Sequence, residues 1–195
     1  MGYGLIRMIF WLAVFMSVYS KLVHTKLLKT KRNLAALIVL WMVLWSASAF
    51  LPVENLFISF TSPESAFYYT NSGKITDIIY GDNSCLIFSS SEKAYILKSS
   101  SGYNITTMFS EKRISQNLVT PMSFWVYRVS GTDDYYVMGY KCEDIDGPVN
   151  IYDGNGDLKG TFEDVTTSGF TYAYVSKFDN RYYAIVNGKK VQIAK

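Results

Sequence analysis

An uncharged apolar run from Leu34 to Leu51, LAALIVLWMVLWSASAFL, constrains the fold of this chain more than any other feature. An α-helix needs about 20 predominantly apolar residues to cross the hydrocarbon core of a bilayer, and within that core all of its backbone polar groups are bonded internally. The run therefore predicts a membrane-spanning helix over residues 34–51. Trp41 and Trp45 should share one face of it, because residues four apart are neighbours on a helix.

Two other interpretations of this run stay open. A buried core helix has a similar composition, although such helices are usually shorter. A secretory signal peptide is the second alternative, because a basic stretch precedes the run and Ala47-Ser48-Ala49 fits a cleavage pattern of small residues. A signal peptide that follows another apolar run is unusual, so a retained membrane span is favoured.

A second apolar run covers residues 3–20 and is interrupted only by Arg7. An arginine near a helix end can extend its side chain to the lipid headgroups, so Arg7 is compatible with a membrane span. Tyr3 and Tyr19 flank the run, where amphipathic rings prefer to lie. Together the two runs predict a membrane anchor over residues 1–52, built as a transmembrane helical hairpin.

The loop between the runs, residues 20–33, contains basic residues and no acidic ones. Short loops rich in lysine and arginine stay on the cytoplasmic side of a membrane. The predicted topology determinants are Lys21, Lys26, Lys29, Lys31 and Arg32. With two spans, both termini then lie outside, and the lipid bilayer is a predicted partner. Nucleic acid is not, because a basic loop beside a membrane is more often a topology determinant.

Charge is distributed unevenly along the chain. Residues 1–52 carry six of the 19 basic residues and none of the 16 acidic ones, so their formal charge is +6 and that of residues 53–195 is −3. The second part is large enough to bury its own core, and no Pro-, Gly- or Ser-rich linker divides it. It is predicted to be one extracytoplasmic, soluble and monomeric β-rich domain of a multi-pass cell-membrane protein.

The start of this domain contains one helical pattern. Residues 53–60 are expected to form an extended connector. A short helix is predicted over 62–71, because Ser62 suits the N-cap, Pro63 the first helical position and Glu64 the positive end of the helix. Gly73 should end this helix.

From Lys74 onward, short alternating segments are separated by turn residues. Strands are predicted over residues 75–80, 84–89, 93–98, 103–108, 124–130, 135–141, 148–152, 158–162, 171–177, 181–187 and 190–194. Asn187-Gly188 predicts a type I′ hairpin, because both residues tolerate positive φ. The spacing indicates a membrane-anchored all-β fold, an antiparallel meander that forms a sandwich or a barrel, and propeller-like blades would give the same local pattern.

Few residues could carry catalytic or metal chemistry. The only histidine, His24, lies in the predicted cytoplasmic loop, which excludes a Ser-His-Asp triad or a histidine-based zinc site outside. The segment 90–93 (SSEK) fits an S-x-x-K pattern, but it falls in a turn and the partner motifs are missing. Residues 153–157 (DGNGD) have the alternating oxygens of a calcium loop, but Leu158 replaces the required glycine. No catalytic residue, metal site or cofactor is therefore predicted.

Two further groups leave alternatives open. Glu143, Asp144 and Asp146 form either a solubilising loop or a carboxylate site for glycoside cleavage. Cys85 and Cys142, the only cysteines, can form a disulfide in an oxidising compartment. Two buried free thiols are the slightly favoured alternative, because cysteine packs well as a small hydrophobic residue.

Tyrosines point to a function in binding. Fourteen of the 16 tyrosines follow Pro52, and a tyrosine ring on a sheet can stack on a sugar or a peptide. The favoured hypothesis is a non-catalytic binding module for a cell-surface glycan or protein partner, with Tyr135 and Tyr182 as exposed ligand-binding residues. A sensor that relays an outer signal through the helices is the second hypothesis. A carboxylate-dependent enzyme acting on cell-surface polysaccharide is the third.

Overall fold

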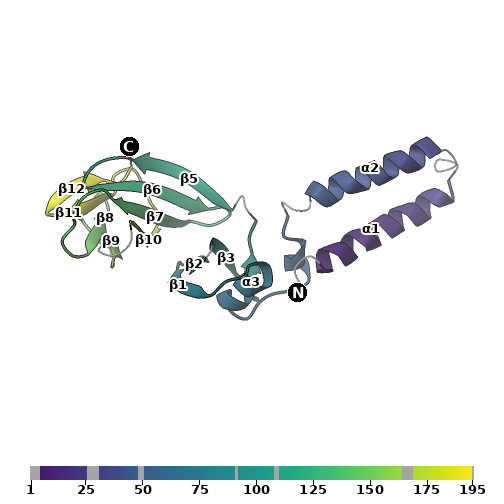
Figure 1. Ribbon diagram of the computed structural model, residues 1–195, viewed down its shortest axis with the longest axis horizontal. Helices are drawn as coiled ribbons and strands as arrows, with labels where there is room; N and C mark the ends of the chain where they lie inside the picture. Colours follow the sequence, from purple (N-terminus) through teal and green to yellow (C-terminus); the bar gives the residue numbers. More distant parts are fainter. Residues whose placement is uncertain are drawn as a thin grey trace.

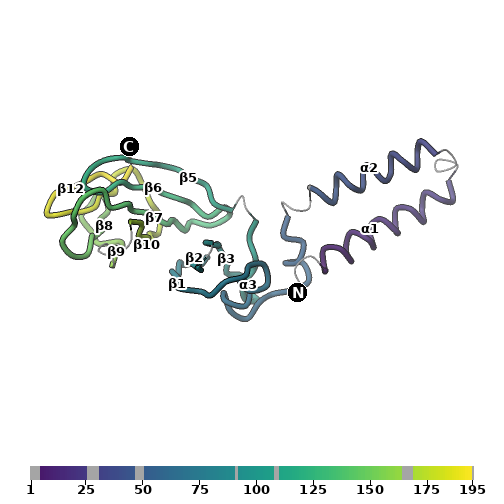
Figure 2. Tube along the Cα trace, in the orientation of Figure 1, coloured from purple at the N-terminus to yellow at the C-terminus, as the bar shows by residue number. Residues whose placement is uncertain are grey.

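The computed structural model describes residues 5–25, 31–47, 51–90, 92–107, 110–163 and 169–194. Its helices are α1 (Leu5–Val23), α2 (Lys31–Ala47), the 3-10 helix η3 (Val53–Leu56) and α3 (Pro63–Thr70). The first two form an antiparallel hairpin that projects away from the β-rich remainder (Figure 1). In the chain trace of Figure 2, α3 and the first strands lie between this hairpin and the later strands.

Aromatic side chains join the two helices of the hairpin. Trp41 Nε1 donates to the carbonyl oxygen of Trp11 at 3.2 Å, and the rings of Trp41 and Phe15 meet edge to face with their centres 5.5 Å apart. The rings of Trp41 and Trp45 are also 5.5 Å apart, which confirms that these two residues share one helix face.

Among the described helices, only α1 is long and apolar enough to cross a membrane. Its 19 residues extend about 28 Å at 1.5 Å per residue, and none of them is buried. A signal sequence near the N-terminus would meet the same criterion. α2 has 17 described residues and begins with Lys31 and Arg32, so the predicted second span over 34–51 and the multi-pass arrangement are not supported. Residues 48–50, which include Ser48 and Ala49 of the cleavage pattern, lie outside the described residues.

The connection between the hairpin and the β-rich part differs from the expected extended connector. Residues 53–56 form η3, and the backbone N–H groups of Phe57 and Ile58 both donate to the Glu54 carbonyl at 2.9 Å. The side chain of Asn55 bonds the backbone of Ile105 through both its amide nitrogen and its oxygen, at 2.9 and 3.1 Å. These local and long-range bonds stabilise a helical turn that the apolar sequence alone does not specify.

Arg7 is also placed differently from the sequence expectation. Its Nη2 atom donates to Glu54 Oε2 at 2.8 Å and to the Leu51 carbonyl at 3.3 Å. The Glu54 side chain is fully buried, so its carboxylate is a stronger attraction for Arg7 than solvent or headgroups at this position. The Arg7 side chain therefore connects α1 to η3.

α3 begins as predicted. Ser62 Oγ accepts a hydrogen bond from the Ser65 N–H, and Ser65 Oγ accepts one from the Ser62 N–H, both at 3.2 Å, which completes a capping box. Pro63 occupies the first turn, where its missing N–H costs nothing. The helix ends at Thr70, and Gly73 follows with a φ of 130°.

The described residues form twelve strands. They are β1 (Ile75–Tyr80), β2 (Ser84–Ser89), β3 (Lys93–Ser99), β4 (Gly102–Ile105), β5 (Glu111–Asn117), β6 (Met122–Val129), β7 (Asp134–Lys141), β8 (Val149–Tyr152), β9 (Leu158–Phe162), β10 (Phe170–Ser176), β11 (Tyr183–Val186) and β12 (Lys189–Gln192). Asn187 and Gly188, between the last two, have φ values of 49° and 74°, which confirms the predicted hairpin turn.

The strands make three four-stranded sheets. Sheet A has the order β1-β2-β3-β4, sheet B the order β10-β7-β6-β5, and sheet C the order β12-β11-β8-β9. All of the described pairings between these strands are antiparallel. The predicted fold class, mainly antiparallel β with few helices, is confirmed at this level.

Sheet B is the central layer, because its side chains alternate between two packed faces. In β10, Ala173 and Val175 enter the core shared with sheet C, whereas Tyr172 and Tyr174 pack towards sheet A. The other face of sheet A packs against α3, whose Phe67 is fully buried. Burial of a phenylalanine side chain contributes about 1.5–3 kcal/mol, so α3 is an integral part of this fold.

β5 is a strand that the sequence analysis does not predict. Its sequence EKRISQN has one apolar residue, Ile114, and therefore lacks the alternation of a half-buried strand. It lies at the edge of sheet B, and its register with β6 shifts between Arg113 and Ser115. Charged residues and irregular pairing are typical of edge strands, because they oppose the addition of further strands.

Candidate functional site

The face of sheet B that sheet C does not cover is rich in aromatic side chains. Strand pairing sets these residues in three rows across the sheet: Tyr174–Tyr136–Tyr127, Tyr172–Met138–Trp125 and Phe170–Tyr140. We call these eight residues the aromatic face. Cross-strand pairs of this kind each stabilise a sheet by about 0.2–1 kcal/mol, and their exposed members also offer flat apolar surfaces to a ligand.

Sheet A covers one end of the aromatic face. Tyr136 is fully buried there, with its ring centre 5.5 Å from that of Tyr95 and 5.7 Å from that of Tyr174. At the other end, Tyr140 and Phe170 are 38% and 52% exposed, and their ring centres are 4.7 Å apart. The surface thus passes from a buried, rigid end to a pair of accessible rings.

A cleft of about 980 Å³ adjoins the accessible end. It lies between β1 and β10, which are edge strands of sheets A and B, and it extends to residues of β9. We call it the aromatic cleft, and its aromatic and acidic lining residues are Tyr80, Phe88, Phe170, Tyr172, Tyr174, Asp77, Glu92 and Glu163. The rings of Phe88 and Tyr172 are 4.7 Å apart, so sheets A and B form a continuous wall.

Lys93 binds sheet A to sheet B at this cleft. Its Nζ lies 2.9 Å from Glu111 Oε2 and 4.7 Å from the ring centre of Tyr127. The ring centres of Tyr95 and Tyr172 are both 5.7 Å from the same atom, within the range of cation–π attraction. Burial raises the pKa of Tyr172 to about 12, and neighbouring Tyr127 and Glu111 act in the same direction. Its hydroxyl is therefore protonated at neutral pH.

A buried carboxylate holds another wall of the cleft. Asp134, which is 1% exposed, accepts hydrogen bonds from Ser84 Oγ at 2.7 Å, from the Asn83 N–H at 2.8 Å and from the Tyr174 hydroxyl at 3.2 Å. Burial raises the pKa of Tyr174, so this hydroxyl stays protonated and can donate. The Tyr174 ring is fixed before a ligand arrives, which lowers the entropic cost of binding.

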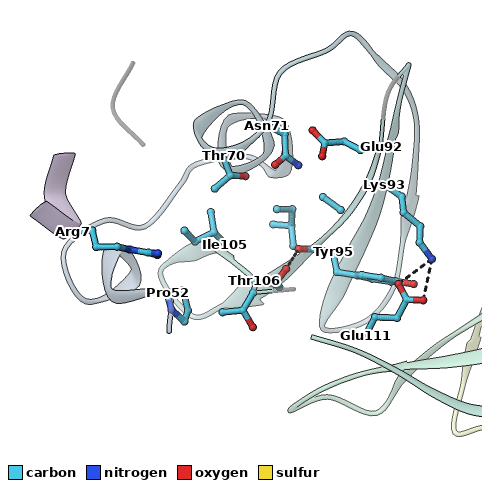
Figure 3. A pocket seen from close by; sticks show the side chains of 13 residues that line it. Arg7, Pro52, Thr70, Asn71, Glu92, Lys93, Tyr95, Ile105, Thr106 and Glu111 are labelled. Carbon is cyan, nitrogen blue, oxygen red and sulfur yellow. Dashed lines mark hydrogen bonds and ion pairs between the residues drawn. The ribbon is translucent and has the colours of Figure 1, made fainter. Parts of the chain in front are cut away.

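A second cavity, of about 380 Å³, lies between the end of α3, strands β3 and β4, and the start of α1. Arg7 lies on one side of it, and Glu92 and Lys93 lie on the other (Figure 3). Arg7 is paired with Glu54, and Lys93 with Glu111. The lining of this cavity is mixed polar and apolar, and these pairs satisfy its cations, so the aromatic cleft is the stronger candidate for ligand binding.

The two tyrosines predicted to bind a ligand lie outside the aromatic cleft. Tyr182 is only 4% exposed, and its hydroxyl donates to the carbonyls of Ser176 and Lys177 at 3.2 and 3.4 Å. The expectation that it is exposed is wrong, because its ring completes the core between sheets B and C. Tyr135 is half-buried on the same side of sheet B, with its ring centre 6.0 Å from that of Phe178.

Both cysteines are free in the structure. Cys85 is buried in β2, and burial raises the pKa of its thiol to about 11. Cys142 follows β7 and is exposed, which corrects the favoured expectation of two buried thiols. The alternative of a disulfide between them is not realised in this arrangement.

The loop that suggested calcium binding is a turn closed by its own backbone. Asp153 Oδ1 accepts hydrogen bonds from the N–H groups of Asn155 and Asp157 at 2.8 and 3.0 Å, and its Oδ2 atom lies 3.1 Å from Lys159 Nζ. Within the described part of the chain, no group of three or more His, Cys, Asp or Glu residues could hold a metal ion. Asp164, which stands at the twelfth position counted from Asp153, where a calcium loop has its last ligand, lies outside that part.

The other candidate chemical groups remain separate. Glu143, Asp144 and Asp146 are exposed and line neither cavity. In the S-x-x-K segment, Ser90 is exposed, and Lys93 is paired as a cation with Glu111. A lysine that activates a serine must be neutral, so this pairing opposes such a role.

The predicted topology determinants are distributed over the hairpin. Lys21 lies in the last turn of α1, and Lys31 and Arg32 begin α2. His24 follows α1 and is exposed. Lys26 and Lys29 fall outside the described residues.

Comparison with known protein families, with characterised proteins and with solved structures finds no match to this chain. The candidate site is therefore defined by its geometry. Alternation could have identified part of it, because Tyr172 and Tyr174, or Trp125 and Tyr127, must share a face of their strand. The local sequence does not indicate which strands are neighbours in a sheet. The complete aromatic face could therefore be recognised only from the observed strand pairing.

Proposed function

We propose that the protein is a membrane-anchored, extracytoplasmic binding module that captures a cell-surface ligand in the aromatic cleft. The ligand is a glycan or a protein that presents flat apolar surfaces to the rings of Tyr140, Phe170 and Tyr172. The aromatic face supports this proposal most directly, because accessible rings are continuous with rings that Asp134 and Lys93 hold rigidly. Rigid, partly exposed aromatic residues bind at low entropic cost.

The surface of the hairpin supports the anchor. Large apolar side chains of α1 and α2 are exposed in the described part of the chain: Leu5, Met8, Ile9, Leu12, Met16, Val18, Val23, Leu34, Ile38, Val39, Leu40, Met42, Val43 and Leu44. A patch of this extent in water would drive aggregation, whereas lipid chains cover it without cost. We therefore propose that both helices lie in the membrane as a two-span hairpin, with the basic loop in the cytoplasm and the β-rich domain outside.

Capture experiments on the full chain in detergent micelles test the binding proposal. Phe170→Ala and Tyr140→Ala should reduce retention on cell-wall polysaccharide or on immobilised surface proteins, whichever holds the wild type. Tyr68→Ala is the matched control, because Tyr68 is a 54% exposed tyrosine on α3 and not on the aromatic face. Retention that is unchanged by both of these aromatic-face variants would contradict the proposed site.

The contact between Arg7 and Glu54 favours a sensor as the second candidate function. It joins the first helix to the β-rich part through a buried ion pair, so a change in either part can bias the other. In that case Arg7→Met should leave ligand capture intact and abolish a ligand-dependent change in cross-linking between α1 and α2. An Arg7→Met protein that still shows this ligand-dependent change would exclude Arg7 as the relay.

A further inference from the structure

In the described part of the segment that joins the hairpin to the β-rich part, from residue 51 onward, three apolar side chains are exposed. Leu51, Leu56 and Phe57 are 60%, 72% and 60% exposed, respectively. In the same segment, Val53 and Glu54 are buried, so η3 has one face towards the protein and one face away from it. We call the three exposed residues the junction patch. Clustered exposed apolar residues mark an interaction surface.

Contacts with α1 set the position of the junction patch. Arg7 Nη2 donates to the Leu51 carbonyl at 3.3 Å and pairs with Glu54 at 2.8 Å. The ring of Phe57 packs against that of Phe10, with centres 5.9 Å apart. Phe10 lies three residues beyond Arg7, which is about 4.5 Å further along the helix axis. Phe57 therefore reaches past the level of Arg7 towards the middle of the hairpin.

The polar groups of this segment are turned away from the exposed face. The Glu54 carboxylate is fully buried and neutralised by Arg7. The Asn55 side chain is bonded to the backbone of Ile105 on the protein side. The face that carries Leu56 and Phe57 thus presents no charge from η3, and it is continuous with the apolar surface of α1.

We propose that the junction patch inserts into the headgroup region of the bilayer and seats the β-rich domain on the membrane surface. Apolar and aromatic side chains beside a span prefer this region. In Figure 1, η3 lies beside the start of α1, where the outer membrane surface falls if α1 spans the bilayer. The proposal rests on the proposed function, because it requires α1 to be embedded. The Arg7–Glu54 pair then fixes the tilt of the domain relative to the membrane.

Site-directed nitroxide labels on the full chain test this seating. Cys142→Ser removes the exposed thiol, and Cys85 is fully buried and should not react. Labels are placed singly at Leu56→Cys and Phe57→Cys. Leu118→Cys and Leu158→Cys are matched controls, because these leucines are 63% and 57% exposed in the β-rich part. Leu12→Cys, on an exposed position of α1, reports whether the anchor is embedded.

The proteins are placed in vesicles of phosphatidylcholine and phosphatidylglycerol, and collisions of each label with oxygen and with a water-soluble nickel complex are measured. We expect the oxygen-to-nickel ratio at Leu56 and Phe57 to be several-fold above that at the two control leucines. If the oxygen-to-nickel ratio at Leu56 and Phe57 equals that of the control leucines while the ratio at Leu12 is typical of lipid, the junction patch does not insert although α1 is embedded. If the ratio at Leu12 is typical of water, α1 is not embedded, and both the membrane anchor and the insertion of the junction patch are wrong. If circular dichroism shows that the Leu56→Cys or the Phe57→Cys protein has lost its strand content, Leu51→Cys is used in its place.

Discussion

Ser84 and Asp134 join sheet A to sheet B through a buried hydrogen bond of 2.7 Å between the serine hydroxyl and the aspartate carboxylate. The Ser84 hydroxyl oxygen also lies 3.0 Å from the Tyr136 hydroxyl. Apolar packing between these two sheets is limited to a small core, which includes Leu86, Val129 and Tyr136. The polar network therefore helps to align the two walls of the aromatic cleft, together with the contacts of Lys93 and the ring pair of Phe88 and Tyr172.

Asp134→Ala should destabilise the β-rich part by about 3 kcal/mol, because it leaves the buried Ser84 hydroxyl and the partly buried donors of Asn83 and Tyr174 without their charged acceptor. Urea unfolding followed by circular dichroism measures this loss. Asp133→Ala is the matched control, since the neighbouring carboxylate is 72% exposed and pairs with Arg128 at the surface. Its cost should stay below about 1 kcal/mol, as for most surface ion pairs. Equal losses in the two variants would contradict a structural role specific to Asp134.

Lys93 should couple energetically to Tyr127 across the boundary between the sheets. A double-mutant cycle with Lys93→Met and Tyr127→Leu should give a coupling free energy of about 0.5–2 kcal/mol, because the ammonium is partly desolvated and lies over the ring. Unfolding free energies of the wild type, both single variants and the double variant supply the four values.

The same cycle at Lys190 and Tyr183 is the comparison, because Lys190 Nζ lies 3.7 Å from that ring centre on the exposed surface of sheet C. Its coupling should fall at the low end of the range, about 0.5 kcal/mol, since water screens the charge. A larger coupling at the surface pair than at Lys93 would contradict the importance of partial burial.

Local sequence patterns specify most of the strands but not their assembly. β1, β2 and β9 have the predicted bounds, because each is a short segment delimited by turn residues. β5 is missed because its side chains are polar, and only pairing with β6 makes it a strand. The pairing of β10 with β7 joins residues 30 to 42 positions apart, and no local pattern encodes it.

Tyr182 and Phe170 show why the site was only partly predictable. Tyr182 follows turn residues and has no alternation that fixes its side of the sheet, and long-range packing buries it. Phe170 becomes a candidate ligand-binding residue only because the register places it opposite Tyr140. The preference of tyrosine for a half-buried sheet surface was a useful guide to the class of site but not to its members.

Stability should fall at alkaline pH. Burial raises the pKa of Cys85 from 9.0 to about 11 and that of Tyr172 from 10.0 to about 12, so the folded state holds these protons more tightly than the unfolded chain. Their contribution is complete below the unfolded pKa values and is lost as pH rises through the folded ones. The urea midpoint should therefore decrease progressively from about pH 9 upward.

Tyr172→Phe should flatten the part of this decrease that lies above about pH 10, because it removes one titrating group. Tyr140→Phe is the matched control for the loss of a tyrosine hydroxyl on the same face of sheet B. An identical pH profile for the wild type and Tyr172→Phe would show that another group controls alkaline unfolding.

The two cysteines should differ in reactivity. Cys142 is exposed and should react with a thiol reagent at neutral pH, whereas Cys85 should react only when the protein unfolds, since burial and a raised pKa both reduce its thiolate fraction. Mass spectrometry should find one modified site in the native protein and two in urea. Rapid modification of Cys85 without denaturant would show that β2 opens readily.

The basic residues of the hairpin loop should determine its orientation. A reporter enzyme that is active only outside the cytoplasm, fused after Lys195, should be active if both helices span the membrane. A single span through α1 with the loop inside would leave the reporter inactive, so the fusion also distinguishes one span from two. Replacing Lys26, Lys29, Lys31 and Arg32 together with glutamine should lower the activity, because the charge that retains the loop is lost. The same number of glutamine replacements at exposed basic residues of the β-rich part, Lys112, Arg113, Lys189 and Lys190, should leave it unchanged.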